Sequence, residues 1–401
     1  MKPLKTNGLV VTIQGTSLLK AIGGFLLFLF MIFSISGALT SLKPEYRISS
    51  SSVNTAATNL TGEMLYHFLG WENHAFLKAM PEDSFPPRFT NMVFKLSTNV
   101  NLDDPRSLLG RELPFFSLYD SKILVAGEGT DYTNMPVESS PPLEVLKAEQ
   151  EAALQNTEGL NSNEENSQSG TPPMTTGDQK AVYVYFSHNR ESFLPYLKGV
   201  NDPNAASHSQ INVTKIGDKL KEELESRGIG TTVDKTDIQG TLNKKGWSYG
   251  QSYEASREVV QAAASTDRDL TYFIDIHRDS RRKEDTTKEI NGKSYAKLAF
   301  VIGAEHQNYE KNLKFASELH KRLEEKYKGL SRGIIQLQGE RTNGKFNQDL
   351  SENAILVEFG GVDNTFEELD RSAEALAEIF SEYYWQAEEV NSTARGESEK
   401  K

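Results

Sequence analysis

Two kinds of hydrophobic pattern alternate along the chain from residue 181 onward. Short runs of β-branched and aromatic residues predict strands at residues 181–186, 229–233, 270–276, 298–302, 333–337 and 354–359. Between them, apolar residues recur every three or four positions and predict helices, with the clearest stripes at Val213, Ile216, Leu220 and Leu224, at Leu313, Ala316, Leu319 and Leu323, and at Phe366, Leu369, Ala373, Leu376 and Phe380. This alternation predicts an α/β fold with a mostly parallel sheet and helices on both faces.

The N-terminal pattern is different, because residues 21–42 contain no charged side chain and are apolar over most of their length. Such a segment is long enough to cross the ~30 Å hydrocarbon core of a bilayer as a helix. Lysines precede it and no acidic residue appears before Glu45, so the positive-inside rule places residues 1–20 in the cytoplasm. The length of the apolar run favours an uncleaved signal-anchor over a signal peptide cleaved near Ser36.

The regions that flank the α/β pattern lack its alternation. Residues 43–139 read as a small, mainly helical extracytoplasmic region that is broken by prolines, and its sequence indicates no chemistry. Residues 140–179 predict a disordered linker, because they offer few large apolar side chains to offset the entropy of ordering. The α/β domain is therefore expected over residues 180–387, followed by a polar, disordered tail over residues 388–401.

Composition narrows the choice of partners and ligands. The chain has 401 residues, of which 37% are hydrophobic and 25% charged, as expected for a globular protein. Its net charge of −12 argues against a nucleic-acid partner, since no concentration of Lys and Arg matches phosphates. With no cysteine, disulfides and thiolate ligands are excluded, so any metal must be held by His, Asp or Glu.

Three of the predicted strands end in a side chain that can bind a metal or move a proton. His188 follows AVYVYFS, His277 closes LTYFIDI, and Glu358 lies near the end of AILVEF. Ligands of open α/β sheets gather at the carboxyl ends of the strands. A single histidine of this kind is more often a buried or capping residue, but three such side chains at one edge predict a zinc hydrolase.

A catalytic zinc needs three protein ligands and one open position for water. His188 and His277 are the first two candidates for its ligands. His208, just before the helical stripe that starts at Val213, is the expected third ligand. The alternative is Glu191, three residues after His188, which otherwise would orient the loop or a histidine ring.

Glu358 is the expected general base. Its neighbours in the strand are apolar, and desolvation of a carboxyl group raises its pKa toward the range in which it can accept and return a proton. The alternative is a buried ion pair with Arg278 or Arg190. If they do not pair with Glu358, these arginines are candidates to bind substrate carboxylates or to stabilise an oxyanion. Arg278 is the preferred candidate.

Several of these segments together resemble the stage II sporulation protein P family. They are the N-terminal apolar run, SHNRES, the stretch around His208, FIDIHRDS and FNQDLSENAILVEFG, whereas the resemblance is weak over residues 43–140. The family is similar to the zinc-dependent N-acetylmuramoyl-L-alanine amidases. Their site combines a first-strand His, a Glu at the start of the next helix, a strand-end His and a late catalytic Glu. The resemblance places these roles at His188, His208, His277 and Glu358, with His208 standing where the amidases have Glu.

The resemblance implies a membrane-anchored cell-wall hydrolase of endospore-forming bacteria. Such an enzyme uses Zn²⁺ to cleave the amide between N-acetylmuramic acid and L-alanine, with an endopeptidase activity on peptide cross-links, in septal wall remodelling and engulfment. Its implied partners are peptidoglycan, the cell membrane, and other sporulation membrane or wall-hydrolase proteins. Two alternatives remain: a non-catalytic wall-binding scaffold of a sporulation membrane complex, and a glycosidase with paired carboxylates.

Overall fold

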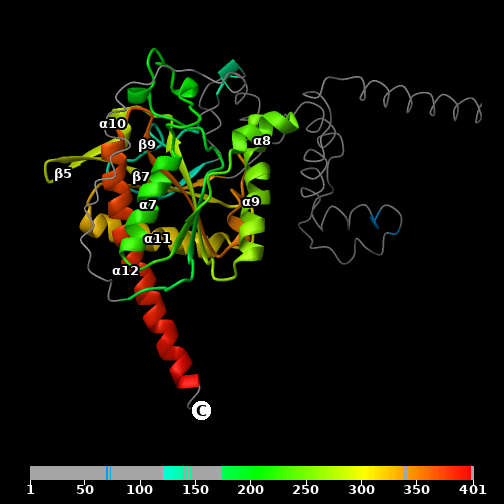
Figure 1. Ribbon diagram of the computed structural model, residues 1–401, viewed down its shortest axis with the longest axis vertical. Helices are drawn as coiled ribbons and strands as arrows, with labels where there is room; N and C mark the ends of the chain where they lie inside the picture. The colour runs from blue at the N-terminus through cyan, green and yellow to red at the C-terminus, as the bar shows by residue number, and fades with distance from the viewer. Residues whose placement is uncertain are drawn as a thin grey trace, which may run out of the picture. The chain divides into compact units, whose positions relative to one another are not determined.

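A computed structural model of the chain describes residues 69, 70, 73, 121–138, 141, 142, 144, 145, 174–337 and 342–398. The predicted signal-anchor, most of the N-terminal region and most of the predicted linker lie outside these residues. Within the part of the chain that is described, no helix is long and apolar enough to cross a membrane. What the structure does describe is the α/β domain (Figure 1).

The domain is built on a seven-stranded sheet with the order β1-β8-β7-β9-β4-β2-β3. Its strands are β1 (Lys122–Ala126), β2 (Val182–Tyr185), β3 (Thr231–Val233), β4 (Tyr272–Asp279), β7 (Leu298–Gly303), β8 (Ser331–Leu337) and β9 (Asn353–Gly361). The pairs β2–β3, β2–β4, β4–β9 and β7–β8 are parallel, whereas β1–β8 and β7–β9 are antiparallel. The prediction of a mostly parallel sheet is therefore confirmed. A separate hairpin joins β5 (Thr287–Ile290) to β6 (Lys293–Ala296).

Helices cover both faces of this sheet, as predicted (Figure 1). They are α7 (Thr214–Ser226), α8 (Ile238–Lys245), α9 (Ser252–Thr266), the short α10 (Lys283–Thr286), α11 (Tyr309–Lys326) and α12 (Phe366–Ser398). The apolar stripes of α7, α11 and α12 pack in one large core with the sheet. On the opposite face, Val260 of α9 packs against Tyr183, Tyr185 and Phe273.

The alternation of side chains along β4 and β9 decides which residues face which helix. In β4, Ile274 and Ile276 join the core under α7, α11 and α12, whereas Phe273 faces α9. Asp275 and His277 follow Phe273 at intervals of two, so they fall on the α9 face. The same rule applies in β9, where Glu358 lies opposite His277 in the parallel register. The side chains of Asp275, His277 and Glu358 therefore lie on the face of the sheet that α9 covers.

The sheet begins earlier in the chain than expected. β1, with the largely apolar sequence KILVA, forms one edge of the sheet, where it pairs with β8 and is interrupted by a bulge between Ile123 and Val125. It lies in residues 43–139, so a domain boundary at residue 180 leaves out one of the sheet's strands. The strand is too short to stand out in the sequence, and it is stabilised by distant contacts, namely its pairing with β8 and the packing of Ile123, Leu124 and Val125.

The C-terminal tail also differs from the prediction. α12 continues to Ser398, so residues 388–398 are helical rather than disordered. The apolar stripe that packs on the domain ends near Tyr384. Adding a residue to an existing helix gains a hydrogen bond without the cost of nucleation, so the helix extends beyond its packed part.

Gly217 allows α7 to approach the end of β2. A Cβ atom at this position would lie 2.4 Å from Cζ of the buried Phe186. In Gly217→Ala, overpacking should lower the free energy of unfolding by ~1–3 kcal/mol. The better helix propensity of alanine should raise it by only ~0.5–1 kcal/mol, so we expect a net loss of stability. Urea unfolding measures the difference. The control is Gly250→Ala, where the nearest atom is 4.0 Å away; a Gly217→Ala variant as stable as the control would contradict the packing described.

Candidate metal centre

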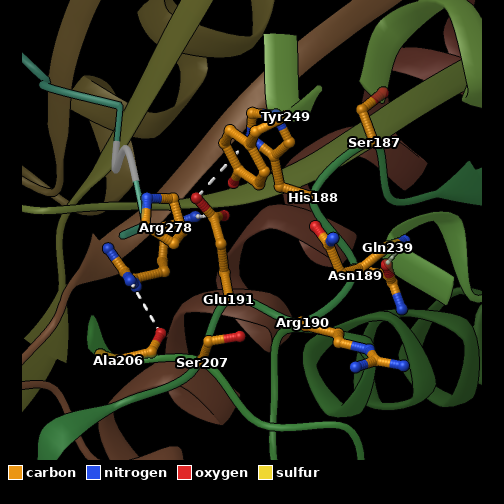
Figure 2. Close-up of a pocket in the computed structure, with 11 residues that line it drawn as sticks. Ser187, His188, Asn189, Arg190, Glu191, Ala206, Ser207, Gln239, Tyr249 and Arg278 are labelled. Atoms are coloured by element: carbon orange, nitrogen blue, oxygen red, sulfur yellow. Dashed lines mark hydrogen bonds and ion pairs between the residues drawn. The ribbon is translucent and has the colours of Figure 1, made fainter. Parts of the chain in front are cut away.

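The structure brings His188 and His277 together at one edge of the sheet. His188 lies just beyond β2 and His277 lies within β4, and their ring centroids are 4.9 Å apart. Both are almost fully buried, with exposed fractions of 4% and 1%. The ring of Tyr249 stacks on His188 with a centroid distance of 4.4 Å (Figure 2). Two imidazoles from neighbouring strands therefore face each other in a site that is closed to bulk water on most sides.

Two glutamates supply carboxylates to the pair of histidines. Glu191 reaches both of them, with Oε1 3.8 Å from Nδ1 of His188 and Oε2 3.7 Å from Nδ1 of His277. Glu138 approaches from another segment, with Oε1 3.0 Å from Nδ1 of His188. Glu138, His188 and His277 each offer a ligand atom within 4.8 Å of the others. The site thus presents two nitrogen and two carboxylate donors.

These donors fit a zinc ion. Ligand bonds of ~2.0–2.2 Å in tetrahedral geometry place neighbouring donor atoms roughly 3.3–3.5 Å apart, and the distances of 3.0, 3.7 and 3.8 Å bracket that separation. Nδ1 of His188 and Oε1 of Glu191 are buried without a hydrogen-bond partner among the described residues. Buried polar atoms are rarely left unpaired unless another ligand satisfies them. These nitrogen and oxygen donors also agree with the absence of cysteine, which rules out thiolate ligands.

A third carboxylate, that of Asp275, approaches the other nitrogen of His277. Nε2 of His277 lies 3.1 Å from Oδ1 of Asp275. Asp275 in turn accepts hydrogen bonds from the backbone N–H and the hydroxyl of Ser187, at 2.9 and 2.6 Å. This carboxylate–histidine pair leaves Nδ1 of His277 facing Glu191, which is how ligating histidines are usually oriented. Asp275 was not among the predicted site residues, although its position two residues before His277 on one strand marks it as a neighbour on the same face.

The charges around His277 favour a cation. Burial alone would lower the pKa of His277, but the surrounding carboxylates, above all Asp275, followed by Glu191 and Glu358, raise it to about 10. The direction of this shift shows that anionic groups outweigh desolvation at this ring. The carboxylates around this ring thus favour a positive charge at this position, as expected around a bound metal ion.

Glu358 lies in β9 beside His277, and one of its carboxyl oxygens has no hydrogen-bond partner among the described residues. Its exposed fraction is 5%, and Oε2 accepts no hydrogen bond from the described residues. Burial raises the pKa of Glu358 well above its usual range; Glu191 raises it further, and His277 opposes the shift. The alternative, an ion pair with Arg190, is not seen, because the guanidinium of Arg190 binds Asp237 with an N–O distance of 2.6 Å. A carboxyl group with a raised pKa next to a metal site has the properties of a general base.

Arg278 has a different environment from the one expected. Its exposed fraction is 1%, and its guanidinium donates to the backbone carbonyls of Ser192, Ala206 and Pro203 at 2.9, 3.0 and 3.2 Å. Its backbone N–H donates to Oε2 of Glu191 at 3.0 Å (Figure 2). These contacts hold the loop that carries Glu191. They give no support to the predicted role of Arg278 in binding substrate carboxylates or an oxyanion.

The structure does not bring His208 to the other predicted ligands. Its Nδ1 accepts hydrogen bonds from the backbone N–H groups of Gln210 and Ile211, at 3.1 and 3.0 Å. His208 thus stabilises the turn before α7, and it is absent from the metal-compatible group found among the described residues. The third ligand is better sought in a carboxylate, and Glu191, the alternative given by the sequence, does lie at the site.

Glu138 is the donor that the sequence did not indicate. Its segment is fixed to the end of β4, where the backbone N–H of Val137 donates to Oδ1 of Asp279 at 2.9 Å. Asp279 also forms a buried ion pair with Arg332 at 2.5 Å. The N–H of Ser280 donates to the carbonyl of Val137 at 3.0 Å. These bonds position Glu138 beside His188, although the two are fifty residues apart in the chain.

A small pocket opens beside the histidines. It is lined by Pro141, Ser187, His188, Asn189, Arg190, Glu191, Ala206, Ser207, Gln239, Tyr249 and Arg278 (Figure 2). A second tyrosine, Tyr253 of α9, lies next to the pocket and donates its hydroxyl to Oε1 of Glu138 at 2.8 Å. Burial raises the pKa of Tyr249 and Tyr253 well above the usual range, reinforced by Glu191 and Glu138 respectively, so both hydroxyls stay protonated.

Comparison with known proteins assigns this domain to a family. The model of the family described as Stage II sporulation protein P matches residues 103–381. The chain belongs to this family. Stage II sporulation protein P of Bacillus subtilis (strain 168) is 51% identical over 396 residues, which cover 99% of this chain and 98% of that protein. The resemblance inferred from the sequence motifs is confirmed, and the matched range includes β1 and Glu138.

A solved structure of the N-acetylmuramyl-L-alanine amidase Ami1 from Mycobacterium smegmatis was also found. It is 12% identical, covers 51% of this chain and 96% of its own, and has a TM-score of 0.28.

The arrangement predicts which histidines hold the metal. We expect His188→Ala and His277→Ala to lose stoichiometric zinc, because each removes one of two facing Nδ1 donors. His208→Ala should keep its zinc, because the Nδ1 of His208 is bonded to backbone N–H groups. Elemental analysis of the purified variants, together with their thermal unfolding midpoints, checks the expectation. Zinc loss in a folded His208→Ala variant would restore His208 as a ligand.

Proposed function

We propose that the chain is a zinc-dependent peptidoglycan hydrolase that cleaves the amide between N-acetylmuramic acid and L-alanine. The observation that carries the proposal is the convergence of two imidazole Nδ1 atoms and buried Glu191 at metal-ligand spacing, beside the buried and unpaired carboxyl group of Glu358. Membership of a sporulation protein family supports a role in septal wall remodelling and engulfment during endospore formation.

His188, His277 and Glu191 are the proposed zinc ligands. Glu191 is 4% exposed, faces both histidines, and is fixed by the backbone N–H of Arg278. Glu138 is the less suitable of the two carboxylates, since its side chain is 42% exposed and its Oε1 also accepts the Tyr253 hydroxyl. A catalytic zinc keeps one position for water or substrate. Glu138, the more exposed carboxylate, would be the group that water or substrate displaces.

The proposed reaction is hydrolysis of an amide with Glu358 as the general base. When bound, zinc supplies Lewis-acid polarisation of the scissile carbonyl and lowers the pKa of a bound water to about 7. Glu358 accepts a proton from the attacking water and returns it to the nitrogen of the leaving L-alanine. The C–N bond breaks, and the products are a lactyl carboxylate and a free amino group. The raised pKa of Glu358 allows the carboxyl group to hold the proton between the two transfers.

The buried charges weigh against the alternative functions. A non-catalytic wall-binding scaffold gains nothing from an unpaired carboxyl group at Glu358, which is costly to bury. A glycosidase needs two carboxyl groups on either side of a sugar linkage, whereas these carboxylates surround two histidines. An endopeptidase activity on cross-links would use the same groups, because that bond is also an amide.

The proposed location follows from the N-terminal charge pattern. The uncharged segment of residues 21–42, with lysines before it, supports a single-pass signal-anchor in the cell membrane. The C-terminal bulk of the chain would then lie outside the cytoplasm, where peptidoglycan is accessible. Other sporulation membrane proteins are the partners proposed for this location.

Metal removal and loss of the base should have separable effects. A chelator should abolish cleavage of purified cell wall, and added zinc should restore it. Glu358→Gln should keep its zinc and lose ~10²–10⁴-fold in rate, since general-base catalysis is typically worth that much. The control is Glu352→Gln, whose side chain is 58% exposed and pairs with Lys311. A fully active Glu358→Gln variant would remove the proposed base.

The two glutamates should differ in their effect on zinc affinity. Removal of a residue that merely orients a ligand typically costs about 10–100-fold in metal affinity. Glu191→Ala should lower the zinc affinity by more than this factor, whereas Glu138→Ala should lower it by less. Competition with a chromophoric chelator measures both constants. The opposite order would make Glu138 the resident ligand and Glu191 the accessory one.

A further inference from the structure

The hydroxyl of Tyr253 points at an anionic oxygen beside the metal ligands. It donates to Oε1 of Glu138 at 2.8 Å, and the same oxygen lies 3.0 Å from Nδ1 of His188. If His188, His277 and Glu191 hold the zinc, Glu138 is not one of its ligands, and substrate would replace its carboxylate beside His188. A carboxylate oxygen in that place has the charge that a scissile carbonyl oxygen acquires when water attacks.

We propose that Tyr253 is a catalytic residue whose hydroxyl donates a hydrogen bond to the oxyanion formed on the scissile carbonyl. The proposal rests on the proposed function, because it needs an acyl-transfer reaction at this site. The carboxylate of Glu138 stands in for the oxyanion in the structure, and its oxygen marks where the oxyanion would be bound.

Tyr253 is held as a rigid donor. Its exposed fraction is 5%, and its ring packs edge-on against Phe346 with a centroid distance of 5.1 Å. It lies nearly parallel to the ring of His277, at 6.0 Å and 15°. Its backbone carbonyl accepts a hydrogen bond from Nδ2 of Asn347 at 3.1 Å. A donor fixed in this way stabilises the transition state without reorganisation, which is what makes oxyanion-binding groups effective.

The protonation state of Tyr253 does not change during the reaction. Water oxygen bonds to the carbonyl carbon, Glu358 takes one water proton, and the carbonyl π electrons move to the oxygen that Tyr253 faces. The electrons then return, the C–N bond breaks, and Glu358 gives its proton to the leaving nitrogen. Tyr253 keeps its own proton throughout and acts only as a hydrogen-bond donor.

Glu138 has to leave this position when substrate binds. Its side chain is 42% exposed, so it can turn outward while the backbone of Val137 stays bonded to Asp279. The bond between Tyr253 and Glu138 therefore has two explanations. Tyr253 either serves the oxyanion or merely holds Glu138 in place, and the two explanations predict different results when Glu138 is absent.

Tyr253→Phe in the full chain removes the hydroxyl and keeps the ring. With a soluble muramoyl-peptide as substrate, we expect kcat to fall by ~10²–10³-fold, with KM, zinc affinity and the thermal unfolding midpoint little changed. The matched control is Tyr183→Phe, whose hydroxyl donates to Asp234 at 2.7 Å outside the site; its activity should equal that of the unmodified chain. A Tyr253→Phe variant with full kcat would overturn the proposal and leave the proposed function standing.

The same comparison is made without turnover by measuring the affinity of a phosphinate analogue of the muramoyl–L-alanine amide. Its tetrahedral anionic oxygens mimic the oxyanion, so Tyr253→Phe should weaken its binding about as much as it lowers kcat. Both losses should persist in a Glu138→Ala background. If they vanish there, Tyr253 acts only through Glu138 and the proposal fails. If the unmodified zinc-loaded chain neither cleaves the substrate nor binds the analogue, the proposed function fails and this inference with it.

Discussion

The burial of several carboxylates around two histidines is the constraint on which the rest of the site depends. Asp275, Glu191 and Glu358 are 0%, 4% and 5% exposed, and all three raise the pKa of His277. Charges of one sign cannot be buried together unless hydrogen bonds or a cation compensate them. A divalent metal bound among these side chains would provide that compensation and would supply the proposed chemistry.

The loops around the site are arranged to hold these charges in place. The guanidinium of Arg278 donates hydrogen bonds to backbone carbonyls around the loop that carries Glu191, and the backbone N–H of Arg278 donates to that glutamate. The buried pair of Asp279 and Arg332 fixes the segment that carries Glu138. Arg278, a catalytic candidate in the sequence, therefore acts on the geometry of a carboxylate, whereas we propose that Glu358 transfers the proton and that Tyr253 donates a hydrogen bond.

The sequence predicted the part of the site that strands determine. His188, His277 and Glu358 were found because each ends an apolar strand, and the carboxyl ends of parallel strands meet at one edge. The positions in loops were not predictable in this way. His208 was expected as a ligand, but its ring stabilises a turn, and no periodicity distinguishes these uses. Glu138 depends on β1, a five-residue strand whose pairing with β8 no local pattern reveals.

Mass spectrometry of cell wall digested in ¹⁸O-labelled water is the most direct test of whether this cluster hydrolyses the amide between muramic acid and L-alanine. Our account predicts one ¹⁸O atom in the lactyl carboxyl group of the glycan and a new amino terminus on L-alanine, both dependent on zinc. New reducing sugar ends, or label only in the cross-link peptides, would contradict the assigned bond. A zinc-loaded chain that binds wall and releases no labelled product would contradict catalysis itself.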